Sequence, residues 1–171
     1  HPVLENYELS EGKAVLHGTD ITLDMVDTPT FLGIRQRDFN MDFAVDVTAD
    51  KGEAGVTKYM SESEHYEVAI RENSDGFEAV LKLNIGDIKH VQSTLPLSGN
   101  KARLIVRADN YGYKFFVNDN GKETGLGYGS TKYLSSEVSG GFTGVVMGLY
   151  AVGSNTAEFT KLNIDYFENK E

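Results

Sequence analysis

The stretch Met41-Asp42-Phe43-Ala44-Val45-Asp46-Val47 decides the fold class, because its large apolar side chains occupy every second position. Successive side chains of a β-strand point to opposite faces, so this period of two predicts a strand with one buried face. The same alternation returns in three later stretches, at residues 77–85, 102–108 and 111–117. We therefore expect several short strands that each bury one face in a common core.

Turn-forming residues separate these strands, in clusters at 49–52, 73–76 and 118–121. The pairs Asp75-Gly76 and Asn120-Gly121 favour hairpins, because glycine and asparagine tolerate the positive φ that tight turns demand. Hairpins join antiparallel neighbours. No stretch of ten or more residues places apolar side chains at helical spacing. The pattern therefore predicts an all-β sandwich or barrel of antiparallel strands.

The chain has 171 residues and carries no internal repeat and no linker rich in proline or serine. A chain of this length can bury a core without disulfides or a structural metal. We therefore predict one domain spanning residues 1–171. The chain opens with His1-Pro2-Val3 rather than methionine, and we expect it to be a mature or excised fragment of a longer protein.

The charge and the cysteine content exclude several classes of function. With 26 acidic against 16 basic residues, the formal net charge is −10, and the basic residues are scattered singly. Such a surface repels nucleic-acid phosphates and anionic lipid headgroups, so we expect neither a nucleic acid nor a membrane as partner. The absence of cysteine excludes disulfides and thiolate sites, but it does not decide between a secreted, periplasmic or cytoplasmic location.

The run Glu62-Ser63-Glu64-His65-Tyr66-Glu67 is the first candidate for catalysis. Retaining glycosidases use two carboxylates about 5 Å apart, a spacing that same-face neighbours on a strand can supply. The run also falls where a hairpin turn is expected, between the strand-like stretches 53–60 and 66–70. We favour the interpretation that these acids belong to a solvated turn, because short motifs often match by accident.

Residues for other chemistries are missing or wrongly spaced. The glycine-rich stretch 125–130 lacks the following helix that a phosphate site needs. No Gly-x-Ser-x-Gly motif is present, and the four histidines show no metal-ligand spacing. We therefore expect no zinc site, no serine nucleophile and no cofactor.

Aromatic and basic side chains on polar strand faces are candidates for carbohydrate binding. Sugars stack their apolar faces on aromatic rings, while planar polar side chains bind their hydroxyl groups. Strand parity predicts that five such residues face solvent: Tyr59, Arg71, Arg103, Arg107 and Tyr150. A polar face of this kind is equally typical of an ordinary solvated sheet, so both interpretations stay open.

Several separated stretches resemble the C-terminal domain of family 43 glycoside hydrolases, the β-xylosidase and arabinofuranosidase group. Residues 28–36, TPTFLGIRQ, are similar to that domain's Pro-x-Phe-Leu-x-Arg-Arg-Gln stretch. Residues 141–151, GFTGVVMGLYA, resemble its Gly-Phe-Thr-Gly-Ala-Phe-Val-Gly run, and 157–159 with 165–167 resemble the segment that ends in its Asp-Tyr-Phe motif. Residues 53–66 are similar to its Ala-Gly-x-x-x-Tyr hairpin. The matches follow the family's order and spacing along most of the chain.

The resemblance implies a concanavalin A-like jelly-roll sandwich of two antiparallel sheets. It also implies a non-catalytic role: in this family a five-bladed propeller carries the catalytic carboxylates, and this domain packs beside it and lends a phenylalanine to the active-site rim. Phe142 stands at the matching position. Related domains are grouped as xylan-binding modules, so a xylan or arabinoxylan chain is the expected ligand. We expect Arg35, Gln36 and Phe142 to bind it, followed by Tyr59 and Arg107.

The chain departs from the family pattern at two places. Ile34 stands where the family commonly has the first arginine of Arg-Arg-Gln, and residues 161–164 form an insertion before the Asp-Tyr-Phe motif. We expect these changes to affect the contact with the propeller and the choice of sugar, and to leave the fold intact.

Other points stay open. Asp165 and the acidic N-terminal segment are candidate ligands for a structural calcium, which some concanavalin A-like sandwiches hold. An independent sandwich glycosidase or lyase, and a purely structural domain, are the alternatives to a binding module. The sequence does not fix the preferred sugar or the functional sheet face, because parity orders faces only within one strand.

Overall fold

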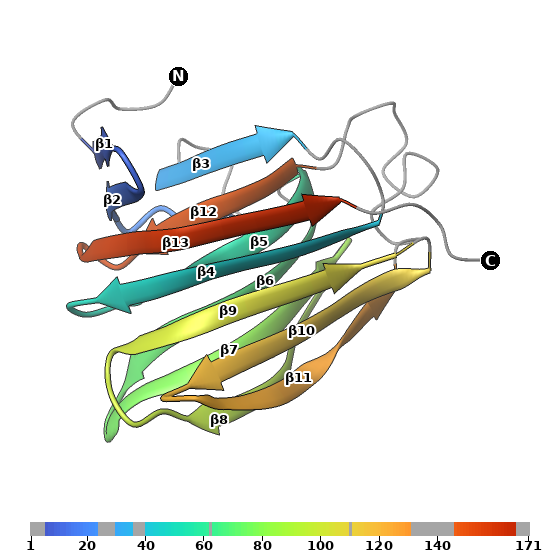
Figure 1. The fold of residues 1–171 in the computed structure, drawn as a ribbon. Helices are drawn as coiled ribbons and strands as arrows, with labels where there is room; N and C mark the ends of the chain where they lie inside the picture. The colour runs from blue at the N-terminus through green and yellow to red at the C-terminus, as the bar shows by residue number, and fades with distance from the viewer. Residues whose placement is uncertain are drawn as a thin grey trace.

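The period-two stretches form strands of two antiparallel sheets (Figure 1). The computed structural model describes residues 6–23, 30–35, 40–61, 63–109, 111–130 and 146–166, with the side chains of residues 34, 35, 60 and 61 left undescribed. The seven-stranded sheet has the order β1 (Tyr7–Ser10), β2 (Lys13–His17), β13 (Thr156–Tyr166), β4 (Met41–Ala49), β9 (Lys101–Ala108), β10 (Gly112–Asp119) and β11 (Lys122–Ser130). The six-stranded sheet has the order β3 (Thr30–Arg35), β12 (Val146–Val152), β5 (Glu53–Ser61), β6 (Glu64–Asn73), β7 (Gly76–Ile85) and β8 (Ile88–Pro96).

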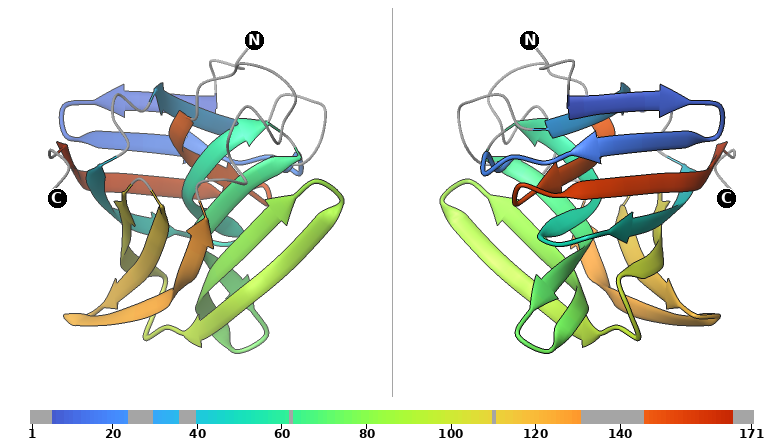
Figure 2. Two further views of the ribbon diagram at one scale, coloured as in Figure 1. Left: turned by 90° about the vertical axis from the view of Figure 1, so that its right-hand side faces the viewer. Right: turned by 90° about the vertical axis from the view of Figure 1, so that its left-hand side faces the viewer.

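The two sheets pack face to face and enclose one main apolar core between them (Figure 2). Strand β4 shows the reason most clearly, since its side chains alternate strictly between buried and half-buried along its whole length. Its buried residues join those of β6 and β7 in this core, where Tyr66, Tyr113 and Phe115 pack edge to face or tilted. The prediction of an all-β sandwich is therefore confirmed.

Two of the predicted turns are the hairpins that their residues favour. Strands β6 and β7 are joined through Asn73 to Gly76, and β10 and β11 through Asn120 and Gly121, whose φ angles are 55° and 91°. Positive φ at both central residues matches the right-handed twist of the flanking strands. The turn at residues 49–52 is different, because β4 and β5 belong to different sheets. This connection crosses from one layer to the other, and the prediction of an antiparallel neighbour there was wrong.

Strand β13 bulges within residues 161–164, the stretch that the family pattern suggests is an insertion. Thr160 lies opposite Asp46 and Asn163 lies opposite Ala44, so β13 holds one residue more than its partner β4 between these positions. Lys161 takes a φ of 52° in the bulge. Ile164 and Tyr166 still pack against the core, so the bulge keeps the inward side of β13 intact.

Several strands begin or end at one end of the sandwich, which faces the viewer in the left panel of Figure 2. Arg35 ends β3 there and Ser130 ends β11, while Val146 begins β12. The pairing of Val146 with both Arg35 and Tyr59 places β3 and β5 on either side of β12 at this end. Among the described segments, none is a helix long and apolar enough to cross a membrane.

Candidate functional site

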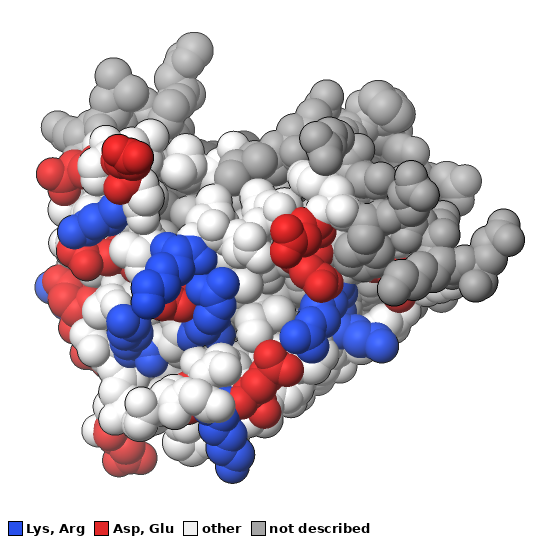
Figure 3. Space-filling view, in the orientation of Figure 1, with Lys and Arg blue, Asp and Glu red and all other residues white. Residues whose placement is uncertain are grey.

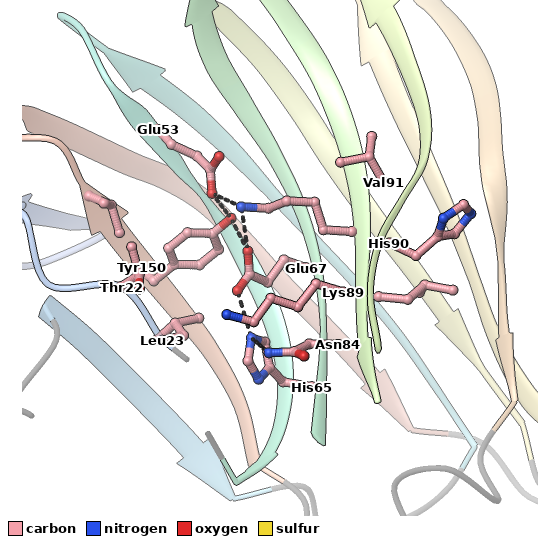
Figure 4. Close-up of a pocket in the computed structure, with 13 residues that line it drawn as sticks. Thr22, Leu23, Glu53, His65, Glu67, Asn84, Lys89, His90, Val91 and Tyr150 are labelled. Carbon is pink, nitrogen blue, oxygen red and sulfur yellow. Dashed lines mark hydrogen bonds and ion pairs between the residues drawn. The ribbon is translucent and has the colours of Figure 1, made fainter. Parts of the chain in front are cut away.

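A network of charged and polar side chains lies on the outer face of the six-stranded sheet (Figure 4). Alternation along β5, β6 and β7 turns Ala54, Val68 and Leu81 into the core and their neighbours Glu53, Glu67 and Lys82 to the outside. Glu67 lies directly opposite Lys82 in the sheet, so an acid and a base meet across two neighbouring strands. Tyr150 reaches the same place from β12.

The two carboxylates of this network converge on one ammonium group. Lys82 Nζ lies 2.6 Å from Glu53 Oε2 and 2.8 Å from Glu67 Oε2. The Tyr150 hydroxyl lies 2.7 Å from the same Glu53 oxygen and 3.2 Å from the same Glu67 oxygen. His65 Nε2 is 2.9 Å from the other oxygen of Glu67, Oε1. Both oxygens of Glu67 are therefore engaged by the protein.

Burial and neighbouring charges fix the protonation of the network. Burial raises the pKa of Glu67, but the hydrogen bond from His65 and the charge of Lys82 outweigh it and bring that pKa down to about 2. Burial lowers the pKa of Lys82, but Glu67 and Glu53 outweigh it and leave that pKa above its ordinary value. Burial and the same two carboxylates raise the pKa of Tyr150 well above its ordinary value. At neutral pH Glu67 is therefore ionised, and Lys82 and Tyr150 keep their protons.

A cavity of about 190 Å³ opens over this network. Glu67, His65 and Asn84 line it from the sheet, with Thr22 and Leu23 on one side and Lys89 and Val91 on the other (Figure 4). Leu23 also packs on Tyr150 in a small apolar cluster with Ala69 and Val80. Thr22 and Leu23 therefore cover part of a sheet face that the sequence marks as solvated.

The acidic run at 62–67 is a hairpin, as the sequence predicts, but it is not a solvated one. Glu64 pairs with Ser61 across the turn between β5 and β6, and residue 62 lies outside the described part of the chain. Glu64 and Glu67 are both buried, and their odd spacing places them on opposite faces of β6. Glu64 accepts a 2.7 Å hydrogen bond from the Ser63 hydroxyl. These two acids therefore do not form a same-face pair.

The predicted binding residues on the six-stranded sheet have different surroundings. Tyr59 is half-buried on the outer face, with its ring centroid 5.4 Å from Phe31 and 5.5 Å from His65. Arg71 is half-buried on the same face and pairs with Glu78. Tyr150 is only 1% exposed, so the prediction that it faces solvent was wrong. Parity places its ring on the outer face correctly, but Leu23 packs over it.

Arg103 and Arg107 lie on β9, which belongs to the opposite, seven-stranded sheet. They point to its outer face, because the alternate residues of β9 face the core. Arg107 stacks on the Phe116 ring at 4.5 Å and pairs with Glu123 at 3.4 Å, at a well exposed position. On this side of the molecule, basic and acidic side chains are interspersed (Figure 3). Arg107 and Tyr59 therefore cannot contribute to one flat binding surface.

The other predicted ligand residues are only partly covered by the structure. The backbone of Arg35 is placed opposite Val146, the residue that also pairs with Tyr59, but its side chain lies outside the described part. Gln36 and Phe142 also lie outside the described residues. Their roles stay predictions.

The candidate calcium ligand has a protein partner. Asp165 accepts a 2.8 Å hydrogen bond from Asn163 Nδ2, and the acidic residue of the segment 1–5 lies outside the described residues. In the part of the chain that the structure describes, no three His, Asp or Glu side chains gather in a group that could hold a metal ion. The described residues thus give a calcium site no geometric support.

Sequence reasoning missed Lys82, Glu53 and the buried lysine of the core. Lys82 and Glu53 occupy outward positions of their strands, where a charged residue signals only a solvated face. Lys58 lies inside the sandwich, fully buried, with its Nζ 3.5 Å from Met41 Sδ and 4.8 Å from the Tyr113 ring centroid. Burial lowers its pKa to about 7. Lys58 lies two residues after Val56 and four after Ala54, so strand alternation places its side chain on the same inward face as theirs. This alternation was the signal that could have predicted its burial.

Known proteins are similar to this chain in sequence and in fold. Residues 1–170 match the family model described as the β-xylosidase C-terminal concanavalin A-like domain. The non-reducing end α-L-arabinofuranosidase BoGH43B of Bacteroides ovatus is 32% identical over 177 residues, which cover 98% of this chain and 33% of that protein.

Solved structures give the same result. Bacteroides ovatus GH43B from a xyloglucan locus superposes with a TM-score of 0.89 at 28% identity, over 98% of this chain and 36% of that one. The GH43 protein BlXynB of Bacillus licheniformis has the same fold, with a TM-score of 0.88 at 18% identity over 98% of this chain and 36% of that one. This chain spans about a third of the length of these relatives. It belongs to the family of β-xylosidase C-terminal concanavalin A-like domains, the sandwich domains of glycoside hydrolase family 43.

Proposed function

We propose that this chain is a non-catalytic accessory domain of a hemicellulose-degrading glycosidase, which binds xylan-type or arabinoxylan-type chains and packs beside a propeller that performs hydrolysis. The observation that carries the proposal is the state of the acids at the cavity. Glu67 has a pKa of about 2 and both its oxygens are engaged. A general acid for glycoside hydrolysis needs a raised pKa, so Glu67 is unsuited to that role at neutral pH.

Glu53 is no better placed as a catalytic partner. Its carboxylate oxygen is held by Lys82 at 2.6 Å and by the Tyr150 hydroxyl at 2.7 Å. A retaining glycosidase also needs a second, protonated carboxyl group as general acid, and the other acid that lines the cavity, Glu67, has a pKa of about 2. The network is thus built to hold fixed charges, which suits ligand binding better than bond breaking.

The length of the relatives supports a partner domain. Both Bacteroides ovatus matches place this sandwich over about a third of a longer glycosidase, which leaves most of each protein for another part. At one end of the sandwich, the end of β3 and the start of β12 lie beside Tyr59, and the Tyr66 hydroxyl donates to the carbonyl of Ser130 at the end of β11. The segment that carries Phe142 connects β11 to β12. We propose this end as the side that meets the propeller.

The substrate class follows from the names of the relatives. The curated match is an arabinofuranosidase, and the family is described from β-xylosidases, so pentose-containing hemicelluloses are the proposed ligands. Two alternatives differ in what they predict: an independent glycosidase cleaves its ligand, and a purely structural domain binds no sugar.

Calorimetric titration of this chain with xylo-oligosaccharides and arabino-oligosaccharides, combined with product analysis, tests the proposal. Gluco-oligosaccharides serve as the control ligands. We expect binding of pentose oligomers without release of products. Release of products that is lost on Glu67→Gln would establish an enzyme, and the absence of binding to any oligomer would leave only the structural role.

A further inference from the structure

We propose that the cavity over Glu53, Glu67 and Lys82 is a binding subsite for one neutral monosaccharide unit, held through two adjacent hydroxyl groups. This inference rests on the proposed carbohydrate-binding function and assigns it to a place on the molecule. The site lies on the outer face of the six-stranded sheet, between Leu23 and Val91.

The size of the cavity limits the ligand. Its volume is about 190 Å³, below the roughly 300–1,000 Å³ of sites that bury drug-sized ligands. A single sugar ring is smaller than a drug-sized ligand and suits a cavity of this volume. Residues 22–23 and strand β8 border the cavity on opposite sides, so the longer oligosaccharide would extend out of it rather than along it.

The polar groups of the cavity match a vicinal diol. Lys82 Nζ lies 2.6 Å from Glu53 Oε2, which also accepts from the Tyr150 hydroxyl, so the acceptor beside this donor is the other oxygen of the same carboxylate, Oε1, which has no partner among the described residues. An ammonium group has three protons, and within the described residues Glu53 and Glu67 are the acceptors of Lys82. Two neighbouring sugar hydroxyls can satisfy such a pair at once, because one accepts from the ammonium while the other donates to the carboxylate.

The side chains of the network differ in exposure. This difference separates residues that can contact a ligand from residues that hold them in position. The Lys82 and Glu53 side chains keep 29% and 16% of their surface exposed, whereas those of Glu67 and His65 keep 8% and 3%. Lys82 and Glu53 can therefore reach a ligand in the cavity. Glu67, His65 and Tyr150 hold them in position from below.

The charge balance selects a neutral sugar. Glu53 and Glu67 contribute two negative charges at the cavity, and Lys82 and Lys89 contribute two positive ones. The chain as a whole has a formal net charge of −10, which disfavours an anionic ligand. Leu23, Val91 and Val152 give the cavity apolar walls against which the C–H face of a sugar ring can pack.

Two-dimensional amide NMR of the whole chain, titrated with D-xylose, L-arabinose and D-glucuronate, tests this assignment at the millimolar concentrations that single sugars require. We expect shifts at residues 22–23, 53, 67, 82 and 89–91 with a neutral pentose, and none with glucuronate at the same concentration. Val91→Tyr fills the cavity without touching an ion pair, and it should weaken binding at least about tenfold, which corresponds to about 1.4 kcal/mol.

Ile88→Tyr is the matched control, because Ile88 lies on the same edge strand, is 66% exposed and does not line the cavity. It should leave the dissociation constant within about twofold, a change below about 0.5 kcal/mol. Sugar binding that persists in Val91→Tyr, or shifts that map to the Tyr59 end instead, would overturn the subsite and leave the proposed function standing. No shifts with any sugar or pentose oligomer would overturn both.

Discussion

The two outer faces of this sandwich look alike in the sequence and differ in the structure. On the seven-stranded sheet, Arg107 and Glu123 form an ion pair in which both side chains keep at least 40% of their surface exposed. On the six-stranded sheet, Glu67 and Lys82 occupy the same kind of outward position, yet Glu67 is nearly buried. One reason for the difference is that Thr22 and Leu23 cover part of the outer face of the six-stranded sheet, where Leu23 packs against Tyr150. Strand parity therefore predicts which face a residue is on, but not whether that face is solvated.

This difference in burial also determines how much each ion pair contributes to the free energy of unfolding. Solvent and salt screen an exposed pair, which is worth about 0–1 kcal/mol. A buried group that loses its counter-charge is left desolvated, which costs about 3–5 kcal/mol. The two faces thus predict very different responses to the same kind of substitution.

Lys82→Met should have the largest effect. It leaves Glu53 and Glu67 close together without the ammonium that both contact, so we expect a loss of about 3 kcal/mol in the free energy of unfolding. Urea denaturation at pH 7 measures it. Arg107→Met on the other face is the matched control, and it should change stability by less than about 1 kcal/mol. Equal losses in the two variants would remove the distinction between the faces.

Glu67→Gln should change how the free energy of unfolding depends on pH. Because the folded pKa of Glu67 is lowered to about 2 from an ordinary value of 4.5, its stabilising contribution is complete above about pH 4.5. It is lost as the pH falls through about 2. Wild-type stability should therefore fall between these two values more steeply than that of Glu67→Gln. Parallel curves of unfolding free energy against pH would contradict the lowered pKa.

Lys58 extends the comparison to a buried lysine of the core. Its pKa is lowered, whereas the pKa of Lys82 is raised. The pKa of Lys58 falls to about 7 in the folded chain, while the unfolded chain holds this proton to a much higher pH. The unfolded state then binds more protons, so stability should rise between about pH 7 and pH 9. Lys58→Met should flatten this rise. A flat wild-type curve over the same range would show that Lys58 stays charged in the core.

Thr57→Val should have the smallest effect, with a positive sign. Thr57 lies on the outer face of the six-stranded sheet, fully buried, and its Oγ1 has no hydrogen-bond partner among the described residues. Valine has nearly the same shape and buries no hydroxyl, so stability should rise by up to about 1 kcal/mol. Thermal unfolding of the two proteins checks this. A loss of stability would mean that the hydroxyl has a partner in the folded chain.

The fold was largely predictable because its signals are local. The alternation at 41–47 and the Asn120-Gly121 pair each act within a few residues, and both gave the expected strand and hairpin. The turn at 49–52 was misjudged, because whether a strand returns to its own sheet or enters the other depends on distant partners. For β5 that partner is β12, almost a hundred residues later.

The candidate site was less predictable, because it is assembled from separate strands. Glu53, Glu67, Lys82 and Tyr150 come from four strands, and only their pairing shows that they meet. Tyr59 and Arg107 were grouped as ligand residues, but sequence parity gives no relation between strands of different sheets. The resemblance to family 43 domains supplied the identity of the fold, while the charged network came only from the structure.

The neighbours of Glu67 hold it ionised, and the proposal that the cavity binds a sugar chain rather than breaks it rests on this state. A ¹³C NMR titration of the glutamate side-chain carboxyls, with the Glu67 resonance assigned by its disappearance in Glu67→Gln, tests this directly. We expect Glu67 to titrate at about pH 2. A pKa near neutrality would make Glu67 a competent general acid and would overturn the proposal that this domain is non-catalytic.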